Sequence, residues 1–376
     1  MKRFLRKIFN PRVEPINRIF VYSKNILNNL SYLQELQPKS AIFPVLKSNA
    51  YGHWLLQMTK ILRKTDVPYI VVDSFPEYQI VKKNSEKNIL LLWETNPRNY
   101  KKYDFSRTTF CVYNMETITY LAKLKKKIKI HLFLDTWMHR EWVNQKELKN
   151  ILEFLKNYPK LIVEWVMSHL HSADSLDNDS TQAQIDLFKK MYHIVIDYGH
   201  NPKWRHIWNS AGVFKIQDDF FNAYRPWLAV YWYSPLSESD PYYKLTEKLK
   251  PALQIYSKIT SLHKLSEWDW VGYNNKWIAD KEVFTAAVPF WYTEWLPRTA
   301  SNKIYFRHNK NYYPQIWTIC MNICSMEVSS KSSLFDEVEL IWLDWKNSIY
   351  SLSKASDKII YEILVWLDKN IRRETV

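Results

Sequence analysis

Short apolar runs alternate with longer amphipathic stretches from about residue 14 to residue 235, and no other feature constrains the fold as strongly. The runs are near-continuous, as in strands buried on both faces of a sheet; they are Ser40–Leu46, Pro68–Asp73, Asn88–Leu92, Ile128–Leu134 and Leu161–Met167. Stretches with helical periodicity include Ser23–Leu36, Trp54–Lys64, Met115–Lys126, Gln145–Asn157 and Gln182–Tyr198. Repeated strand-then-helix order predicts a parallel sheet, most economically a (β/α)8 barrel. A doubly wound sheet is the alternative, which the lack of a G-x-G-x-x-G or P-loop motif weakens.

The pattern changes after about residue 243, where apolar residues alternate with polar ones. The segments with this period of two are Ala252–Thr260, Val283–Pro289, Lys303–Arg307, Gln315–Cys320 and Glu337–Trp342. Short polar turns separate them, which indicates a mostly-β second domain. We therefore expect a barrel domain at residues 1–242, with a basic N-terminal extension at 1–13, and a β-domain at residues 243–376.

Composition excludes some classes of protein. A net charge of +15 could serve a nucleic-acid partner, but a lysine-rich solvated surface accounts for it, since no zinc-finger spacing or aromatic–basic alternation is present. No apolar run approaches the ~18 residues of a membrane helix, and the apolar stretches of Met1–Pro11 are too short for a secretory signal. The three cysteines, Cys111, Cys320 and Cys324, indicate a reducing compartment. We expect a soluble cytoplasmic protein without a nucleic-acid partner.

One lysine stands at the end of a predicted strand. Ser40–Leu46 leads directly into Lys47, which Ser-Asn-Ala-Tyr-Gly-His follows. In a (β/α)8 barrel, chemistry takes place where the strands end. A lysine leaving a dry strand is placed for a lowered pKa and for imine formation with an aldehyde. By position alone the signal is weak, because a lysine after a strand is usually a surface residue.

The segment PVLKSNAYGH, residues 44–53, resembles the cofactor-lysine segment of the alanine racemases. Eight further segments resemble motifs of that family, in the same order along nearly the whole chain. They are Leu134–Trp142, Ser168–Asp174, Trp208–Gly212, Tyr224–Pro235, Val271–Tyr273, Pro289–Arg298, Ile316–Asn322 and Ile360–Leu367. Nine ordered matches make the resemblance specific.

The resemblance implies a barrel that binds pyridoxal 5'-phosphate (PLP), a C-terminal β-domain and a head-to-tail homodimer. It implies interconversion of L- and D-alanine by two bases, which supplies D-alanine for peptidoglycan. Lys47 would carry the cofactor and act as one base, and Tyr273 of the partner subunit would be the other. Both side chains ordinarily have a pKa near 10, so both need a lowered pKa at neutral pH.

The same resemblance assigns residues to cofactor and substrate. Besides Lys47, the implied cofactor-binding residues are Tyr51, His169, Asn209, Ser210, Arg225, Trp227, Leu228 and Tyr361. Their O–H and N–H groups suit a phosphate, while Arg225 would bond the pyridine nitrogen. The implied substrate residues are Arg140, Tyr292 and Met321, and Arg140 would also lower the pKa of Tyr273.

Each of these residues also has an ordinary interpretation. The tyrosines could belong to the core, and His169 with His171 could be a strand-end pair or half of a zinc site. No third zinc ligand is evident, so we predict no metal.

The chain departs from the family pattern at several positions. Phe133 stands where many members have a carbamylated lysine that braces the arginine, here Arg140, so the brace is absent or replaced, for example by a bound anion. Asn322 replaces an aspartate, and Thr293 with Glu294 replaces Ala-Asp. These departures put substrate range and rate in doubt more than reaction type.

Glycine and tryptophan occur in abnormal numbers. The chain has 4 glycines and 18 tryptophans, whereas about 26 glycines are expected for this length. Tryptophan stands where the family has glycine at Trp54, Trp137, Trp142, Trp165, Trp227, Trp232, Trp268, Trp291, Trp295, Trp317, Trp342 and Trp366, and at a further four positions, Trp93, Trp208, Trp270 and Trp345. Only Trp204 and Trp277 resemble true tryptophans. Glycine at the 16 positions would leave 20 glycines and two tryptophans, which is an ordinary composition.

These counts suggest a gene that reads UGA as glycine and was translated here with UGA as tryptophan. If the tryptophans are real, bulky residues would occupy turns that need positive φ. We then expect the literal chain to be inactive or not stably folded.

Three rival functions follow from the sequence. One is racemisation of another small amino acid such as serine. Another is a non-catalytic PLP carrier with the same barrel, but such carriers lack the β-domain and its tyrosine, here Tyr273. A nucleic-acid binder rests on charge alone and predicts DNA retention that depends strongly on salt.

Overall fold

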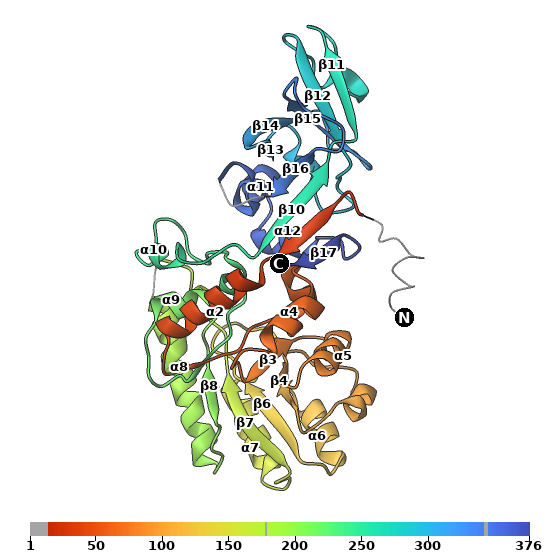
Figure 1. Cartoon of the computed structure of the whole chain (residues 1–376). Coiled ribbons are helices and arrows are strands. Elements are labelled where there is room, and N and C mark those ends of the chain that lie inside the picture. The colour runs from red at the N-terminus through yellow and green to blue at the C-terminus, as the bar shows by residue number, and fades with distance from the viewer. Residues whose placement is uncertain (1–13, 177–178, 342–344) are drawn as a thin grey trace, which may run out of the picture. The chain divides into compact units, whose positions relative to one another are not determined.

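The computed structural model describes residues 14–176, 179–341 and 345–376, and these form two compact units (Figure 1). The first, which we call the barrel unit, is Tyr22–Ala252. The second, which we call the β unit, joins Leu253–Val376 to the described residues that precede Tyr22.

Eight strands of the barrel unit form a closed ring. Six make a parallel sheet in chain order: β3 (Tyr69–Val72), β4 (Asn88–Leu91), β5 (Thr108–Val112), β6 (Ile128–Phe133), β7 (Leu161–Met167) and β8 (Trp204–His206). A parallel pair, β2 (Ala41–Ile42) with β9 (Ala223–Tyr224), closes the ring. On one side Leu46 N–H donates to the Val71 carbonyl at 2.7 Å, and on the other Asn222 N–H donates to the Arg205 carbonyl at 3.1 Å. The predicted (β/α)8 barrel is confirmed.

Helices follow the strands of the barrel. They are α2 (Ser23–Leu36), α3 (Lys47–Tyr51), α4 (Leu55–Leu62), α5 (Phe75–Asn84), α6 (Met115–Lys123), α7 (Gln145–Leu155), α8 (Asp179–Asp197), α9 (Ser210–Lys215) and α10 (Tyr243–Thr246), with 3-10 turns η1 (Pro97–Lys102) and η2 (Leu228–Tyr231). In α7 the buried residues Leu148, Ile151, Leu152 and Leu155 follow the helical period, because one apolar stripe packs on the sheet.

Several barrel elements escaped the sequence pattern. The sequence pattern does not predict β5, β8, β9, α5 or α9. In α5 only Tyr78 and Val81 are buried, so its stripe is too short to stand out. β8 and β9 have three and two residues, which is too short for a periodicity signal.

The β unit contains a nine-stranded sheet with the order β11-β12-β15-β14-β13-β16-β10-β1-β17. The strands are β1 (Arg18–Val21), β10 (Leu253–Lys258), β11 (Ser261–Leu265), β12 (Val283–Val288), β13 (Tyr305–His308), β14 (Asn311–Ile316), β15 (Cys324–Val328), β16 (Glu337–Ile341) and β17 (Arg372–Thr375). Shorter elements are α11 (Ile349–Ser356), α12 (Ile360–Val365), η3 (Tyr273–Asn275), η4 (Arg298–Ala300) and η5 (Trp345–Asn347). The prediction of a mostly-β second part is confirmed.

Strand β1 belongs to this second sheet, although the sequence analysis assigned residues 1–242 to the barrel domain. Arg18–Val21 pairs antiparallel with β10 and parallel with β17. The strand signal of a short segment does not reveal its partners, which here lie more than 200 residues further along the chain.

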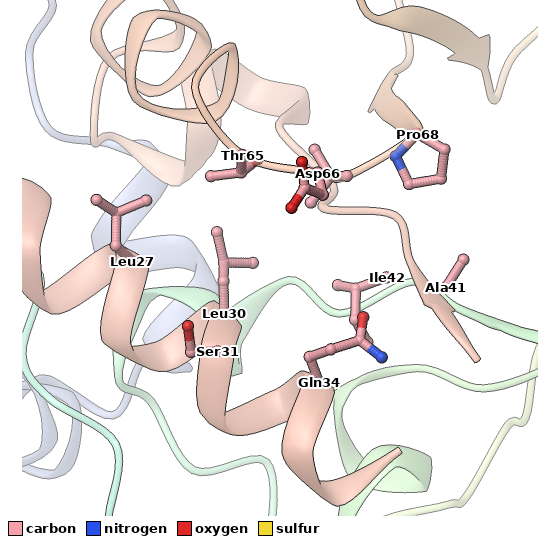
Figure 2. Close-up of a pocket in the computed structure, with 10 residues that line it drawn as sticks. Leu27, Leu30, Ser31, Gln34, Ala41, Ile42, Thr65, Asp66 and Pro68 are labelled. Atoms are coloured by element: carbon pink, nitrogen blue, oxygen red, sulfur yellow. The ribbon is translucent and has the colours of Figure 1, made fainter. Parts of the chain in front are cut away.

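Two further features of the fold concern its helices and a cavity of the barrel unit. None of the helices among the described residues is long and apolar enough to cross a membrane. In the barrel unit, a cavity of about 440 Å³ lies where β2 and β3 begin. Figure 2 shows Leu27 and Leu30 of α2 facing it, with Asp66 and Pro68 opposite. It therefore lies at the opposite end of these strands from Lys47.

Among the residues that the structure describes, six tryptophans have a backbone conformation that favours glycine. Their φ angles are positive: Trp54 (70°), Trp137 (72°), Trp232 (96°), Trp268 (76°), Trp295 (156°) and Trp317 (60°). All six are among the 16 positions identified from the sequence, whereas Trp204 and Trp277 do not adopt this conformation. A left-handed conformation costs a residue with a side chain roughly 1–2 kcal/mol.

Trp268 offers a direct test of this strain, because its side chain is 73% exposed and has little packing to lose. We expect Trp268→Gly to raise the free energy of unfolding by roughly 1 kcal/mol, measured by urea titration. Trp270→Gly is the matched control, since Trp270 is also exposed but lacks a positive φ. It should lower stability by roughly 0.5–1 kcal/mol, and equal effects of the two changes would contradict the interpretation.

Candidate active site

Lys47 follows β2 at the carboxyl end of the barrel strands. Burial lowers the pKa of its ammonium group, Asp73 opposes this shift, and the positive charge of Arg140 adds to it. A lowered pKa leaves more of the amine neutral at physiological pH, which is what a nucleophilic or basic lysine requires. The structure thus supplies the environment that the sequence only suggested.

Arg225 follows β9, the strand that pairs with β2. Its side chain is 2% exposed, and burial lowers the pKa of its guanidinium to about 9. It donates to the Ser168 carbonyl at 2.7 Å and contacts the rings of His206 and His169. A buried cation held by a carbonyl and two imidazoles is well placed to donate to a neutral ring nitrogen of a ligand.

His169 lies beside this arginine, just after β7. Burial, followed by the charge of Arg225, lowers the pKa of its imidazole well below the usual value, so the ring is neutral at pH 7. The Trp227 ring lies against it, with centroids 5.1 Å apart and planes inclined by 32°. The indole therefore covers the imidazole that the family resemblance assigns to the cofactor ring.

Hydrogen-bonding groups converge where α9 begins. Asn209 caps the helix by accepting from Gly212 N–H at 3.1 Å, and the hydroxyl of Ser210 accepts from Trp227 N–H at 2.9 Å. Leu228 begins η2 and is buried. N–H and O–H donors at a helix start form an anion site when they turn toward a phosphate.

Tyr51 ends the short turn that Lys47 begins, and its side chain is 4% exposed. Its ring lies 5.9 Å from that of Tyr231 in η2, measured between centroids. Tyr51 therefore packs against the same 3-10 turn that Leu228 begins.

Arg140 lies in the loop after β6. Its Nε donates to the Glu141 carboxylate at 2.6 Å, and its guanidinium lies over the rings of Trp93 and Trp142. Phe133 is buried and stacks on Trp142 with centroids 4.3 Å apart. An aromatic pair thus occupies the position of the family's lysine brace, and the exposed pair with Glu141 holds Arg140 only weakly.

The other predicted site residues belong to the β unit. Tyr273 is 78% exposed, Met321 is 62% exposed and Tyr292 is 37% exposed, while Tyr361 lies in α12. The Tyr273 carbonyl accepts from Trp317 Nε1 at 3.1 Å.

Two residues near the site were missed by the sequence analysis. His206 ends β8 and contacts Arg225, and the sequence carried no signal for it because β8 itself was not predicted. Glu77 of α5 accepts from Asn49 N–H at 3.0 Å, a contact between residues 28 positions apart for which the sequence carries no signal.

Comparison with known proteins agrees with this geometry. The family model "Alanine racemase, N-terminal domain" matches residues 21–235, and "Alanine racemase, C-terminal domain" matches residues 252–375. A curated alanine racemase of Vesicomyosocius okutanii is 29% identical over 346 residues, covering 92% of this chain and 94% of that protein.

Solved structures give the same result. The alanine racemase of Bacillus anthracis with bound L-Ala-P is 26% identical, with a TM-score of 0.88 over 96% of this chain and 95% of that one. The alanine racemase of Streptomyces lavendulae, at 20% identity, shares the fold with a TM-score of 0.89 over 97% and 98% of the two chains. The chain therefore belongs to the alanine racemase family.

Proposed function

We propose that this chain is a PLP-dependent racemase that interconverts L- and D-alanine and so supplies D-alanine for peptidoglycan. The observation that carries the proposal is a lysine of lowered pKa and a buried arginine on adjacent strands at one end of the barrel. By resemblance to the family, the lysine and the arginine of this pair would both bind the cofactor.

The polar groups of the barrel unit fit PLP. We assign Arg225 to the pyridine nitrogen, His169 to the ring face, and Ser210 with Asn209 to the phosphate. The backbone N–H groups of Trp227 and Leu228, with the hydroxyl of Tyr51, complete the phosphate site of the barrel unit, and the family resemblance adds the hydroxyl of Tyr361. When bound, PLP supplies an electron sink for the α-carbanion of the substrate.

The chain's own residues would move the proton. The neutral Lys47 amine takes the α-proton on one face, since burial lowers the pKa of its ammonium group. Tyr273 serves the other face as the second base, from the partner subunit. Arg140 binds the substrate carboxylate together with the N–H of Met321, and Tyr292 narrows the entrance.

A head-to-tail homodimer is proposed from the surface around Tyr273. This tyrosine is 78% exposed, which does not suit a base that must work in a dry site. Ile278, a large apolar side chain near it in the sequence, is also exposed. A second copy that covered this face would bury the tyrosine and bring it to an active site.

Several narrower assignments belong to the same proposal. The barrel unit, Tyr22–Ala252, is the cofactor domain, the β unit with strand β1 is the β-domain, and the enzyme works in the cytoplasm. Racemisation of serine is the alternative activity, because Phe133 and Asn322 alter the neighbourhood of the substrate. A non-catalytic carrier is disfavoured, since the C-terminal family model matches residues 252–375.

The 16 tryptophans at family glycine positions are proposed to be glycines of a gene that reads UGA as glycine. Positive φ at six of them supports this, and so does the Trp227 ring that covers His169. We call the chain with glycine at these 16 positions the glycine-restored chain.

The nucleotide sequence tests this reading directly. We expect UGA at the 16 codons and UGG at codons 204 and 277. Native peptides should have masses with glycine at 137 and 142. UGG or GGN codons at the 16 positions would refute it, as would native peptides containing Trp137 and Trp142.

Lys47→Ala in the glycine-restored chain tests the cofactor lysine. We expect loss of the visible absorption band of bound PLP and a fall in L- to D-alanine conversion of roughly 10²- to 10⁴-fold or more. Lys64→Ala removes an exposed lysine and is the control. A Lys47→Ala protein that keeps both the band and the turnover would show that another group carries the cofactor.

Complementation tests the shared active site. Lys47→Ala and Tyr273→Phe chains should each be nearly inactive alone. When they are co-expressed, mixed dimers contain one site with both Lys47 and Tyr273, so activity should return. Activity no greater than that of the separate variants would mean that Tyr273 does not act across subunits.

A further inference from the structure

The turn after Lys47 has a left-handed backbone. Ser48, Asn49 and Ala50 each have a φ of 54°, and Tyr51 has a φ of 49°. Residues with side chains usually adopt this conformation singly, because each costs roughly 1–2 kcal/mol. Four in succession persist only where the surroundings hold them. The turn joins Lys47 to Tyr51, so whatever holds it also fixes the spacing of these two side chains.

Glu77 of helix α5 holds this turn in place. It lies in the first turn of α5, and its Oε1 accepts from Asn49 N–H at 3.0 Å. Its Oε2 accepts from Asp73 N–H at 3.3 Å, just after β3. One carboxylate therefore connects the strained turn after β2 to the chain that leaves β3.

Asn49 reinforces the turn from within. Its side-chain oxygen accepts from Leu55 N–H at 2.9 Å, at the start of α4. Because Asn49 uses its side chain for α4 and its N–H for Glu77, the turn is bonded to both α4 and α5 through this one residue. Loss of Glu77 would leave the Asn49 N–H without this acceptor while the strain remained.

Charge gives Glu77 a second effect on the same site. Asp73, Glu77 and Glu141 raise the pKa of Lys47, whereas burial and Arg140 lower it. Burial raises the pKa of the Glu77 carboxyl to about 7, so the carboxylate is charged above that pH, and there its removal lowers the pKa of Lys47 further. A residue that only stabilised the fold would not shift this titration.

We infer that Glu77 is a positioning residue, whose carboxylate holds the left-handed turn at residues 48–51 and so sets Lys47 and Tyr51 for the cofactor. This inference rests on the proposed function, in which Lys47 carries PLP and Tyr51 binds its phosphate. Glu77 itself touches neither cofactor nor substrate in this scheme.

The test compares Glu77→Ala and Glu77→Gln with Glu116→Ala in the glycine-restored chain. Glu116 is the matched control, because it is an exposed acidic residue in the first turn of α6. The PLP dissociation constant is measured from the absorbance of bound cofactor. We expect Glu77→Ala to raise it roughly 10- to 100-fold, as for a lost hydrogen bond to a charged group, Glu77→Gln to raise it less, and Glu116→Ala to leave it unchanged.

A second readout separates positioning from stability. The rate of PLP attachment to Lys47 is followed against pH by borohydride trapping and peptide mass. In Glu77→Gln the midpoint should shift to lower pH, because the neutral amine forms at lower pH once the carboxylate charge is gone. Urea titration reports whether each variant is folded, and Glu77→Gln keeps the test valid if Glu77→Ala does not fold.

The outcomes distinguish the inference from the function. If the unsubstituted chain binds PLP at Lys47 and Glu77→Gln matches it in both readouts, the inference is overturned and the proposed function stands. If the unsubstituted chain does not attach PLP at all, the proposed function fails and the inference fails with it.

Discussion

Closure of the eight-stranded ring is the constraint on which the rest of the structure depends. The two residues of β2 pair with β9, and the chain beyond them bonds to β3 through Leu46 and Val71. Parallel strands present their carboxyl ends on one side, so closure makes neighbours of Lys47 and Arg225, which lie far apart in the sequence. An open, doubly wound sheet would leave these strands at separate places.

Burial at the carboxyl ends of the strands shifts the pKa values of the ionisable side chains there. Burial and the charge of Arg225 lower the pKa of His131 and His169 well below the usual value. The neutral imidazole of His169 can accept from Arg225 without repelling it. Burial disfavours the charged form of both side chains, so it lowers the pKa of Lys47 and of Arg225 alike.

The tryptophans divide into two physical classes. Trp54 and Trp268 occupy backbone conformations that a side chain strains. Trp165 instead fills the barrel core, fully buried, with its ring 4.6 Å from Phe43 and 4.4 Å from Tyr69 between centroids. The backbone therefore argues for glycine at some of the 16 positions, whereas at Trp165 the argument rests on family resemblance and composition.

The sequence by itself determined the alternation of strands and helices, the change to a β-rich second part, and the lysine at the end of β2. These features are local, because buried and exposed residues alternate along the chain with the period of the helix or strand that contains them. Even so, the sequence could not reveal β8 and β9. These short strands lie in no continuous apolar run, because Arg205 lies within β8 and Asn222 and Arg225 flank β9.

Only the tertiary structure decided which distant groups meet. It paired β1 with β10 and β17, placed His206 against Arg225, and brought Glu77 to the Asn49 amide. It also supplied the burial that lowers the pKa of Lys47. The residues next to a side chain in the sequence do not encode such contacts. Closure of the ring sets which loops lie close together, and it also sets how far each charged side chain is buried from water.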